Sequence, residues 1–255
     1  MPRKSRISSA SEIYHIIMRG INRQTIFTTE DEYSRFIYTL GRYKKQCGFE
    51  IYAYCLMPNH LHILMKVGTE PLAQIMRRIC GSYVYWYNKR HDRIGNLFQD
   101  RFRSEAVEDD SYFLTVLRYI HQNPVKAGLC ENIDEYPWSS VREYIEPGIL
   151  VNTAFGNGFF EPDLENSGSN LLKFCQQVMD DKCLDADADQ KHQVSDHTAE
   201  STILRVCQIE SPAQLAQMNR EIRDTYVRIL KTEHQPSVRQ IARITGLNRG
   251  VVLKA

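Results

Sequence analysis

Two apolar runs on either side of a short turn constrain the fold of this chain more than any other feature of its sequence. Residues 49–57 read FEIYAYCLM and residues 60–67 read HLHILMKV, with Pro58 and Asn59 between them. Runs of this length that are rich in β-branched and aromatic residues are typical of strands, and a Pro-Asn pair favours a tight turn. The sequence therefore predicts a largely buried β-hairpin.

The segments around this hairpin alternate between strand and helix patterns. In chain order we expect a strand at 12–20, a helix at 29–48, the hairpin, a helix at 71–92, an extended segment at 96–108 and a helix at 111–123. Thr29 and Gly48 are residue types that begin and end helices, and Pro124 is expected to stop the last helix. This order predicts an α+β fold with helices packed on an antiparallel sheet.

The sequence of the second half of the chain predicts a linker and a small helical domain. Residues 180–200 carry seven acidic residues and two lysines, which is typical of a solvated linker. A helix is expected at 212–233, followed by a helix at 237–245, a turn at Gly246 and a short helix entered through Asn248, which is helix-turn-helix spacing. We divide the chain into a first domain (1–147), an extension with an acidic linker (148–200) and a helix-turn-helix-like all-α domain (201–255).

Charge is segregated along the chain although its net value is only +1. Residues 72–103 carry seven basic and two acidic residues, and the last 53 residues carry nine basic and four acidic ones. This basic–acidic–basic layout fits two modules that face nucleic acid and are joined by an acidic linker. For any single run, a solvated surface is the alternative.

Other features of the sequence exclude several classes of protein. No apolar run approaches the ~18 residues of a membrane span, and the basic N-terminus lacks the apolar core of a secretory signal. The seven cysteines are odd in number and have no C-x-x-C spacing. We therefore expect a reduced, cytoplasmic protein with no membrane partner, no disulfide framework and no cysteine zinc site.

The second strand of the hairpin carries two histidines, His60 and His62. Side chains two residues apart on a strand point to the same face, so both imidazoles project together. Such a pair can hold a divalent metal if a third ligand comes from another element. The alternative is a pair of structural histidines that bond to backbone or acidic groups.

The helix expected at 111–123 offers further groups for such a site. Tyr119 and Asn123 are four residues apart and therefore share one helical face, at the margin of the apolar arc. Tyr112 lies on nearly the same face and is the rival tyrosine. His121 falls on the opposite side, so we interpret it as structural or surface-exposed.

Five blocks of sequence resemble the single-tyrosine HUH transposases, and most closely the REP-associated tyrosine transposases. They read YHIIMRGINRQTIF, MPNHLHIL, NLFQDRFRSE, LRYIHQNPVKAGL and YPWSSVREY, in the family's order. The resemblance implies a ferredoxin-like sheet with helices, the HUH nuclease fold. It also implies that His60, His62 and Asn123 bind Mg²⁺ or Mn²⁺ and that Tyr119 is the nucleophile.

This resemblance leads us to expect an enzyme that cuts and rejoins single-stranded DNA through a 5′-phosphotyrosine. The implied substrate is a hairpin-forming palindromic repeat, and the C-terminal domain is a candidate for binding duplex DNA. A monomer and a homodimer both stay open. Nine basic residues are candidates for DNA contacts: Arg3, Lys4, Arg19, Arg23, Arg77, Arg78, Arg101, Arg103 and Arg249.

Two other functions remain open at this point. A non-catalytic regulator would use the same fold to bind hairpin DNA without cutting it. A metal-dependent phosphodiesterase would use water instead of tyrosine and release free DNA ends. The presence of His60, His62, Tyr119 and Asn123 together favours the transposase chemistry.

Overall fold

The computed structural model describes residues 8–146, 148–160, 167–179, 183–185, 196–232 and 236–255. The chain folds as two compact units, residues 1–186 and 187–255, which we describe separately. Arg3 and Lys4 lie outside the described residues. Within the described residues, no helix is both long enough and apolar enough to cross a membrane.

The first unit is built on a four-stranded antiparallel sheet. Its strands are β1 (Ile13–Arg19), β2 (Glu50–Met57), β3 (His60–Lys66) and β4 (Arg103–Ala106), in the order β2-β3-β1-β4. Helix α1 (Glu30–Cys47) connects β1 to β2, and α2 (Leu72–Arg90) connects β3 to β4. This is the split βαβ arrangement of a ferredoxin-like fold, so the predicted α+β fold class is confirmed.

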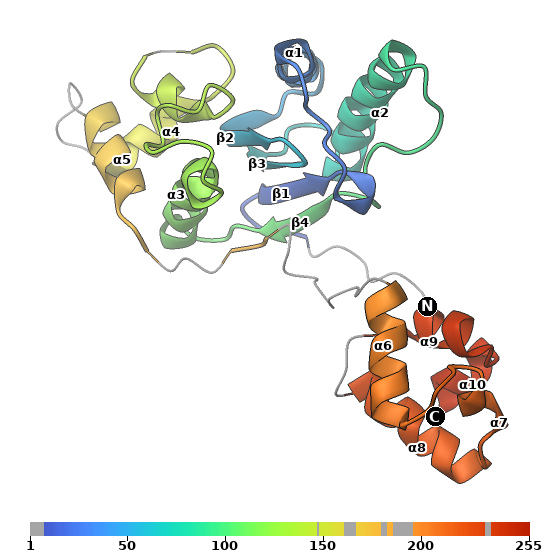
Figure 1. Cartoon of the computed structure of the whole chain (residues 1–255). Coiled ribbons are helices and arrows are strands. Elements are labelled where there is room, and N and C mark those ends of the chain that lie inside the picture. Colours follow the sequence, from blue (N-terminus) through green and yellow to red (C-terminus); the bar gives the residue numbers. More distant parts are fainter. Residues whose placement is uncertain (1–7, 147, 161–166, 180–182, 186–195, 233–235) are drawn as a thin grey trace. The chain divides into compact units, whose positions relative to one another are not determined.

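Helices cover both faces of this sheet (Figure 1). Met18 of β1 contacts Cys80 of α2, with 3.5 Å between the two sulfur atoms, so α2 packs on the face to which Met18 points. His15 has the opposite parity on β1, and its ring contacts Tyr119 of α3 (Asp110–Lys126). The sheet therefore has one face under α1 and α2 and one face under α3.

The N-terminus of α1 shows how local sequence sets these elements. Thr29 and Glu32 form a capping box, in which each side chain bonds to the other residue's backbone, and Glu32 is fully buried. Gly48 ends the helix with a φ of 68°, a left-handed conformation that costs glycine little. Both ends of the helix predicted at 29–48 are confirmed.

One expectation about the first unit is wrong. Helix α3 does not stop at Pro124 but continues to Lys126, because a proline removes only its own N–H from the helix ladder and the next turn still bonds, with Ala127 N donating to Asn123 O. The segment at 96–108, expected to be extended, contains no helix; it forms β4 at Arg103–Ala106 and a single bridge between Phe98 and Gly20.

Short helices follow α3 in the first unit. They are the 3₁₀ turn η2 (Ser140–Tyr144), α4 (Thr153–Asn157), the 3₁₀ turn η3 (Gly158–Phe160) and α5 (Ser167–Gln176). One further 3₁₀ turn, η1 (Ile21–Arg23), lies directly after β1. Gln122 of α3 donates to the carbonyl of Cys175 at 2.9 Å, so α5 packs against α3. The domain limits at 147 and 200 stay a prediction.

The second unit contains five helices within the described residues. They are α6 (Asp196–Cys207), α7 (Gln214–Gln217), α8 (Arg220–Thr232), α9 (Val238–Thr245) and α10 (Arg249–Lys254). The single helix expected at 212–233 is wrong, because Met218 is extended with a ψ of 157° and separates α7 from α8. The two short helices expected around Gly246 are confirmed, and Asn248 caps α10 by accepting from Gly250 N at 2.8 Å.

Candidate active site

His60 and His62 lie on the sheet face that α3 covers. In the pairing of β1 with β3, Arg19 is directly opposite His60 and Ile17 is directly opposite His62. The two imidazole rings have centroids 5.1 Å apart. His62 is fully buried, whereas His60 is half-buried at the start of the strand. The predicted side-by-side arrangement of the two rings is therefore present.

His62 has one ring nitrogen that is bonded and one that is not. Its Nδ1 lies 3.1 Å from Nε2 of His15 on β1. Its Nε2 is buried without a hydrogen-bond partner in the part of the chain that the structure describes. Burial is the main cause that holds the pKa of His62 well below its ordinary value, and the nearby His15 and His60 lower the pKa further. A neutral imidazole with an unpartnered nitrogen has the form that binds a metal ion.

His15 is a residue of this site that the motif-based reasoning missed. It is fully buried, and burial lowers its pKa to about 3, so its ring is neutral. Its ring stacks on that of His62 with centroids 5.3 Å apart. One signal was available in the sequence: His15 is the only strongly polar residue inside the apolar run IYHIIM of the predicted first strand.

Tyr119 is the tyrosine that the fold brings to the histidines. Its ring centroid lies 5.7 Å from that of His62 and 5.9 Å from that of His15, in edge-on contacts. The ring is 7% exposed, and Nζ of Lys126 lies 5.2 Å from its centroid. Lys126 therefore brings positive charge close to the Tyr119 ring.

The rival tyrosine, Tyr112, is committed to another contact. Its hydroxyl donates to Glu105 Oε2 at 2.6 Å, and burial together with this carboxylate raises its pKa. A tyrosine held in this way is a poorer nucleophile than its ordinary form. The two tyrosines therefore differ in their surroundings: Tyr119 contacts the histidine rings, whereas Tyr112 is bonded to Glu105.

Asn123 lies one turn after Tyr119 and is half-buried. Its Nδ2 donates to the carbonyl of Tyr119 at 2.8 Å, which orients the amide and leaves Oδ1 as the atom that could bind a cation. His60 Nδ1 lies 2.6 Å from Asn59 Oδ1, and since that oxygen can only accept, the nitrogen donates. Among the described residues, no three His, Cys, Asp or Glu side chains form a metal-binding group.

His121, interpreted as structural or surface-exposed, is fully buried on another side of α3. Its Nε2 lies 3.0 Å from Ser140 Oγ, and its Nδ1 lies 3.7 Å from Cys175 Sγ. Burial lowers its pKa to about 3. These contacts join α3 to η2 and α5 and make His121 a structural residue.

Three of the arginines proposed for DNA contacts have distinct surroundings. Nε of Arg78 lies 3.0 Å from Glu70 Oε2 in an ion pair. Arg103 donates to the carbonyl of Asp185 at 3.0 Å. Arg19 is half-buried and opposite His60, so it lies on the histidine face of the sheet.

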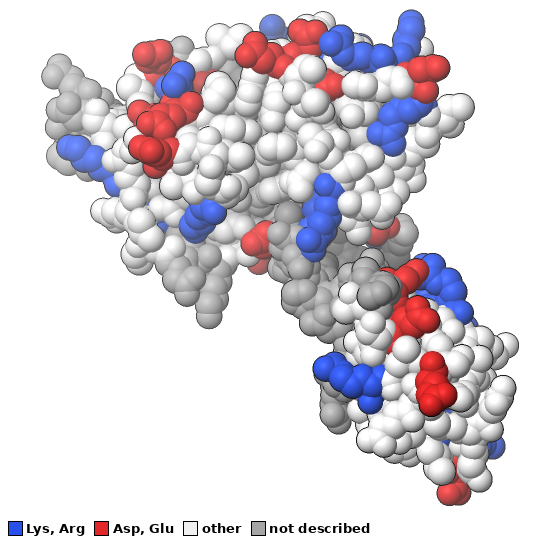
Figure 2. Space-filling model, viewed as in Figure 1, with Lys and Arg blue, Asp and Glu red and all other residues white. Residues whose placement is uncertain are grey.

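The other arginines proposed for DNA contacts that the structure describes are exposed. They are Arg23, Arg77, Arg101 and Arg249, of which the last is the first residue of α10. In the face drawn in Figure 2, lysines and arginines form small separate groups rather than one basic surface. Of the aromatic side chains of α2, Tyr83 and Tyr87 are buried, whereas Tyr85 is 74% exposed.

Comparisons with known proteins show what the first part of the chain is similar to. Residues 8–123 match the family model described as Transposase IS200 like. A Haemophilus influenzae protein, provisionally named a REP-associated tyrosine transposase, is 29% identical over an alignment of 142 residues, and the match covers 49% of this chain and 77% of that protein. The REP-associated tyrosine transposase of Escherichia coli K12 is 23% identical over 129 residues, which are 50% of this chain and 74% of that protein.

A solved structure shows the same fold. It is described as the REP-associated tyrosine transposase bound to a REP hairpin, and it matches with a TM-score of 0.50 and 21% identity. The match covers 60% of this chain and 90% of that one. The resemblance to REP-associated tyrosine transposases that the five sequence blocks predict is therefore confirmed.

Proposed function

We propose, from the match of residues 8–123 to the IS200-like transposase family, that this chain cuts and rejoins single-stranded DNA through a covalent bond to Tyr119. The observation that carries the proposal is the edge-on contact of the Tyr119 ring with His62, while Tyr112 is bonded to Glu105. The match supports a DNA transposase, and the contact supports Tyr119 as its reacting residue.

The reaction that we infer conserves the energy of the phosphodiester. The Tyr119 oxygen forms a bond to phosphorus and loses its proton. The bond from phosphorus to the 3′-oxygen breaks, and that oxygen leaves as a 3′-hydroxyl. A second 3′-hydroxyl then attacks the phosphotyrosine, restores a phosphodiester and returns the proton to Tyr119. No nucleotide cofactor is needed, because each step exchanges one phosphoester for another.

A divalent ion, Mg²⁺ or Mn²⁺, fits the residues present. The unpartnered Nε2 of His62, whose neutral form burial favours, is suited to bind it, and His60 and Asn123 Oδ1 are the other two ligands that we propose. When bound, such an ion stabilises charge on the scissile phosphate and orients it. Two imidazoles suit Mn²⁺ better than Mg²⁺, which prefers oxygen ligands.

His15 acts in this proposal as a positioning residue. Metal binding at Nε2 of His62 requires the proton of that neutral ring to sit on Nδ1, which then donates to Nε2 of His15. A hydrogen bond to the far nitrogen of a ligating histidine fixes its tautomer and orientation. His15 touches the ligand and not the substrate.

We infer that the substrate is a hairpin-forming single strand, because a structural relative was solved with a REP hairpin. The pair α9–α10, with a left-handed Gly246 between the helices, supports duplex DNA as a second partner of the C-terminal unit. A test of the second partner is binding of a radiolabelled duplex at several salt concentrations, by the full chain and by the Arg249→Ala variant.

A denaturing gel tests the main proposal. The full chain is incubated with labelled hairpin oligonucleotides taken from the repeats beside its own gene, with Mn²⁺ or with EDTA. We expect a slow-migrating protein–DNA adduct that requires the metal and Tyr119. The Tyr112→Phe variant is the matched control for Tyr119→Phe and should form the adduct. Cleavage without an adduct would instead indicate hydrolysis, and binding without cleavage would indicate a regulator.

A further inference from the structure

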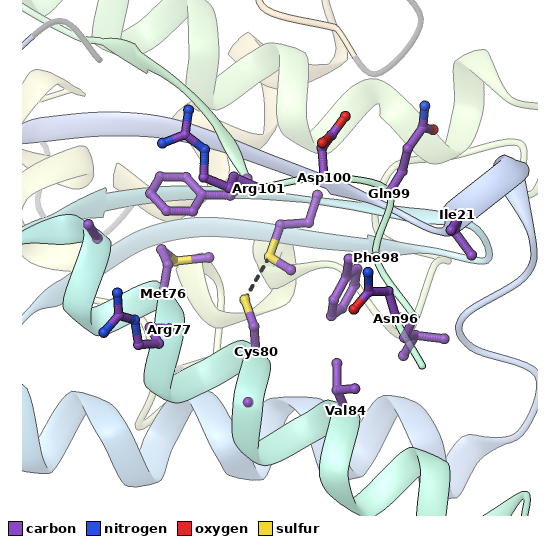
Figure 3. Close-up of a pocket in the computed structure, with 15 residues that line it drawn as sticks. Ile21, Met76, Arg77, Cys80, Val84, Asn96, Phe98, Gln99, Asp100 and Arg101 are labelled. Carbon is purple, nitrogen blue, oxygen red and sulfur yellow. Dashed lines mark hydrogen bonds between the residues drawn. The ribbon is translucent and has the colours of Figure 1, made fainter. Parts of the chain in front are cut away.

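A pocket of about 830 Å³ lies between α2 and the segment 96–102 that precedes β4 (Figure 3). Its interior is mainly apolar. Met76, Cys80 and Phe98 point into it, and Met18 of β1 and Val84 of α2 complete this apolar lining. Two thioethers, a thiol and an aromatic ring form a soft, polarisable surface. Such a surface packs well against the flat π-face of a nucleobase.

Two arginines stand at one end of this pocket, on opposite walls (Figure 3). Arg77 comes from α2 and Arg101 from the segment 96–102, and both are exposed. Within the described residues, neither guanidinium has a hydrogen bond or an ion pair, in contrast to the neighbouring Arg78. Asp100 is the one acidic residue in the lining, so the charged groups of the pocket sum to one positive charge.

The wall that carries Arg101 has a constrained backbone. Asp100 has a φ of 97°, a region that residues other than glycine rarely adopt. Conformations of this kind persist only where the surrounding structure fixes them, and they cluster at functional sites. The turn at Asp100 stands between Gln99 and Arg101, both of which line the pocket.

The pocket is close to the histidine end of the sheet. Phe98 forms a bridge with Gly20, and the N–H of Gly20 donates to the carbonyl of Asn59, the residue before His60. Neighbouring strands lie about 4.8 Å apart, so the segment around Phe98 is roughly 10 Å from the start of β3. The pocket lies on the sheet face under α2, whereas His60 and His62 lie on the face under α3, so a single strand that reaches both passes around this end of the sheet.

We propose that this pocket binds one unstacked base of the single-stranded DNA, with Arg77 and Arg101 on the phosphates beside that base. The inference rests on the proposed function, whose substrate it makes more specific. An apolar cleft with free cations on both walls suits a base between two phosphates better than it suits an uncharged ligand. The same arrangement would select a DNA conformation in which one base leaves the stack.

Gly81 of α2 allows the pocket to be filled without disturbing the core. It lines the pocket, and a Cβ added there would meet no atom within 4 Å. Leucine is a better helix former than glycine, so Gly81→Leu should keep or raise the melting temperature. Gln74→Leu, at an exposed position of the same helix that does not line the pocket, is the matched control.

The experiment measures binding in EDTA, where no cleavage occurs. The full chain is titrated with hairpin oligonucleotides that carry 2-aminopurine at one position of the unpaired flank. We expect the fluorescence to change strongly at one flank position, and this change to be lost in Gly81→Leu but kept in Gln74→Leu. Arg77→Ala and Arg101→Ala should each lower the salt dependence of log Kd by about 1, whereas the ion-paired Arg78→Ala should not.

The outcomes separate this inference from the proposed function. An unchanged fluorescence signal in Gly81→Leu, or no position-specific signal in any protein, would overturn the base pocket even if Tyr119 still forms its adduct. Loss of the signal in Gly81→Leu alone supports the pocket. That result would hold even if the metal-dependent gel showed no adduct, in which case only the proposed chemistry would fail.

Discussion

His15 and His62 are joined across two neighbouring strands by their imidazole rings, with 3.1 Å between His15 Nε2 and His62 Nδ1. Ile17, not His15, is directly opposite His62, so the contact is diagonal, a distance that aromatic side chains can bridge. Both rings are fully buried. The orientation of His62 therefore depends on a residue 47 positions earlier in the chain.

This relationship predicts that His15→Phe weakens metal binding while the fold is kept. Phenylalanine retains a flat ring but cannot bond to Nδ1 of His62, so the tautomer that exposes the Nε2 lone pair is no longer favoured. We expect Mn²⁺ affinity to fall by about 10- to 100-fold. Electron paramagnetic resonance of free Mn²⁺, in the absence of DNA, measures this directly. Tyr119→Phe is the control, and equal affinity in wild type and His15→Phe would refute the role of His15.

A second prediction concerns Asn123 as the third ligand. Asn123→Asp keeps an oxygen at the same position and should retain Mn²⁺ binding. Asn123→Leu removes this oxygen and should lower affinity by at least about tenfold. Both variants lose the bond from Nδ2 to the Tyr119 carbonyl, so this shared loss cannot explain a difference between them. Identical Mn²⁺ affinity in the two variants would remove Asn123 from the ligand set.

The sequence predicted the fold where local signals and burial pointed to the same structure. The hairpin about Pro58-Asn59, the Thr29–Glu32 start of α1 and the Gly48 end are all local signals that the structure contains. Prediction from the sequence failed where tertiary packing determined the local structure. Pro124 lies inside α3 because the surrounding helix is buried, and the break at Met218 has no glycine or proline to mark it.

The candidate site shows the same division between local signals and tertiary contacts. His60 and His62 share a face because strand geometry has a period of two residues, and Tyr119 was selected by the family motif. Residue pattern alone did not separate Tyr119 from Tyr112. Their different surroundings depend on Glu105 of β4, which accepts a hydrogen bond from the Tyr112 hydroxyl. The role of His15 needed the register of β1 against β3, which the sequence does not specify.

A third prediction tests the buried end of α1. Glu32 accepts from the N–H of Thr29 at 3.1 Å and lies 2.6 Å from Nε2 of His91. Glu32→Ala removes these bonds and should lower the free energy of unfolding by about 2 kcal/mol or more. Asp31→Ala is the matched control, since its ion pair with Arg90 is exposed and should matter by less than about 1 kcal/mol. Urea unfolding followed by tryptophan fluorescence reports on the first unit alone, because both tryptophans, Trp86 and Trp138, lie in it.

The last prediction is a pH dependence of stability that comes from His121. In the folded chain, burial lowers its pKa to about 3, whereas an unfolded chain has a histidine pKa near 6.5. Between these values the unfolded state binds a proton that the folded state does not, so stability falls as the pH falls below about 6.5. From pH 7 to pH 5 this linkage costs about 2 kcal/mol of folding stability for one histidine.

The variant His121→Gln tests this prediction. It should be less stable at pH 7, because the contacts with Ser140 and Cys175 change, but its stability should fall less towards pH 5. Urea unfolding of both proteins at the two pH values measures the difference, and parallel losses of stability would show that His121 is already protonated in the folded state.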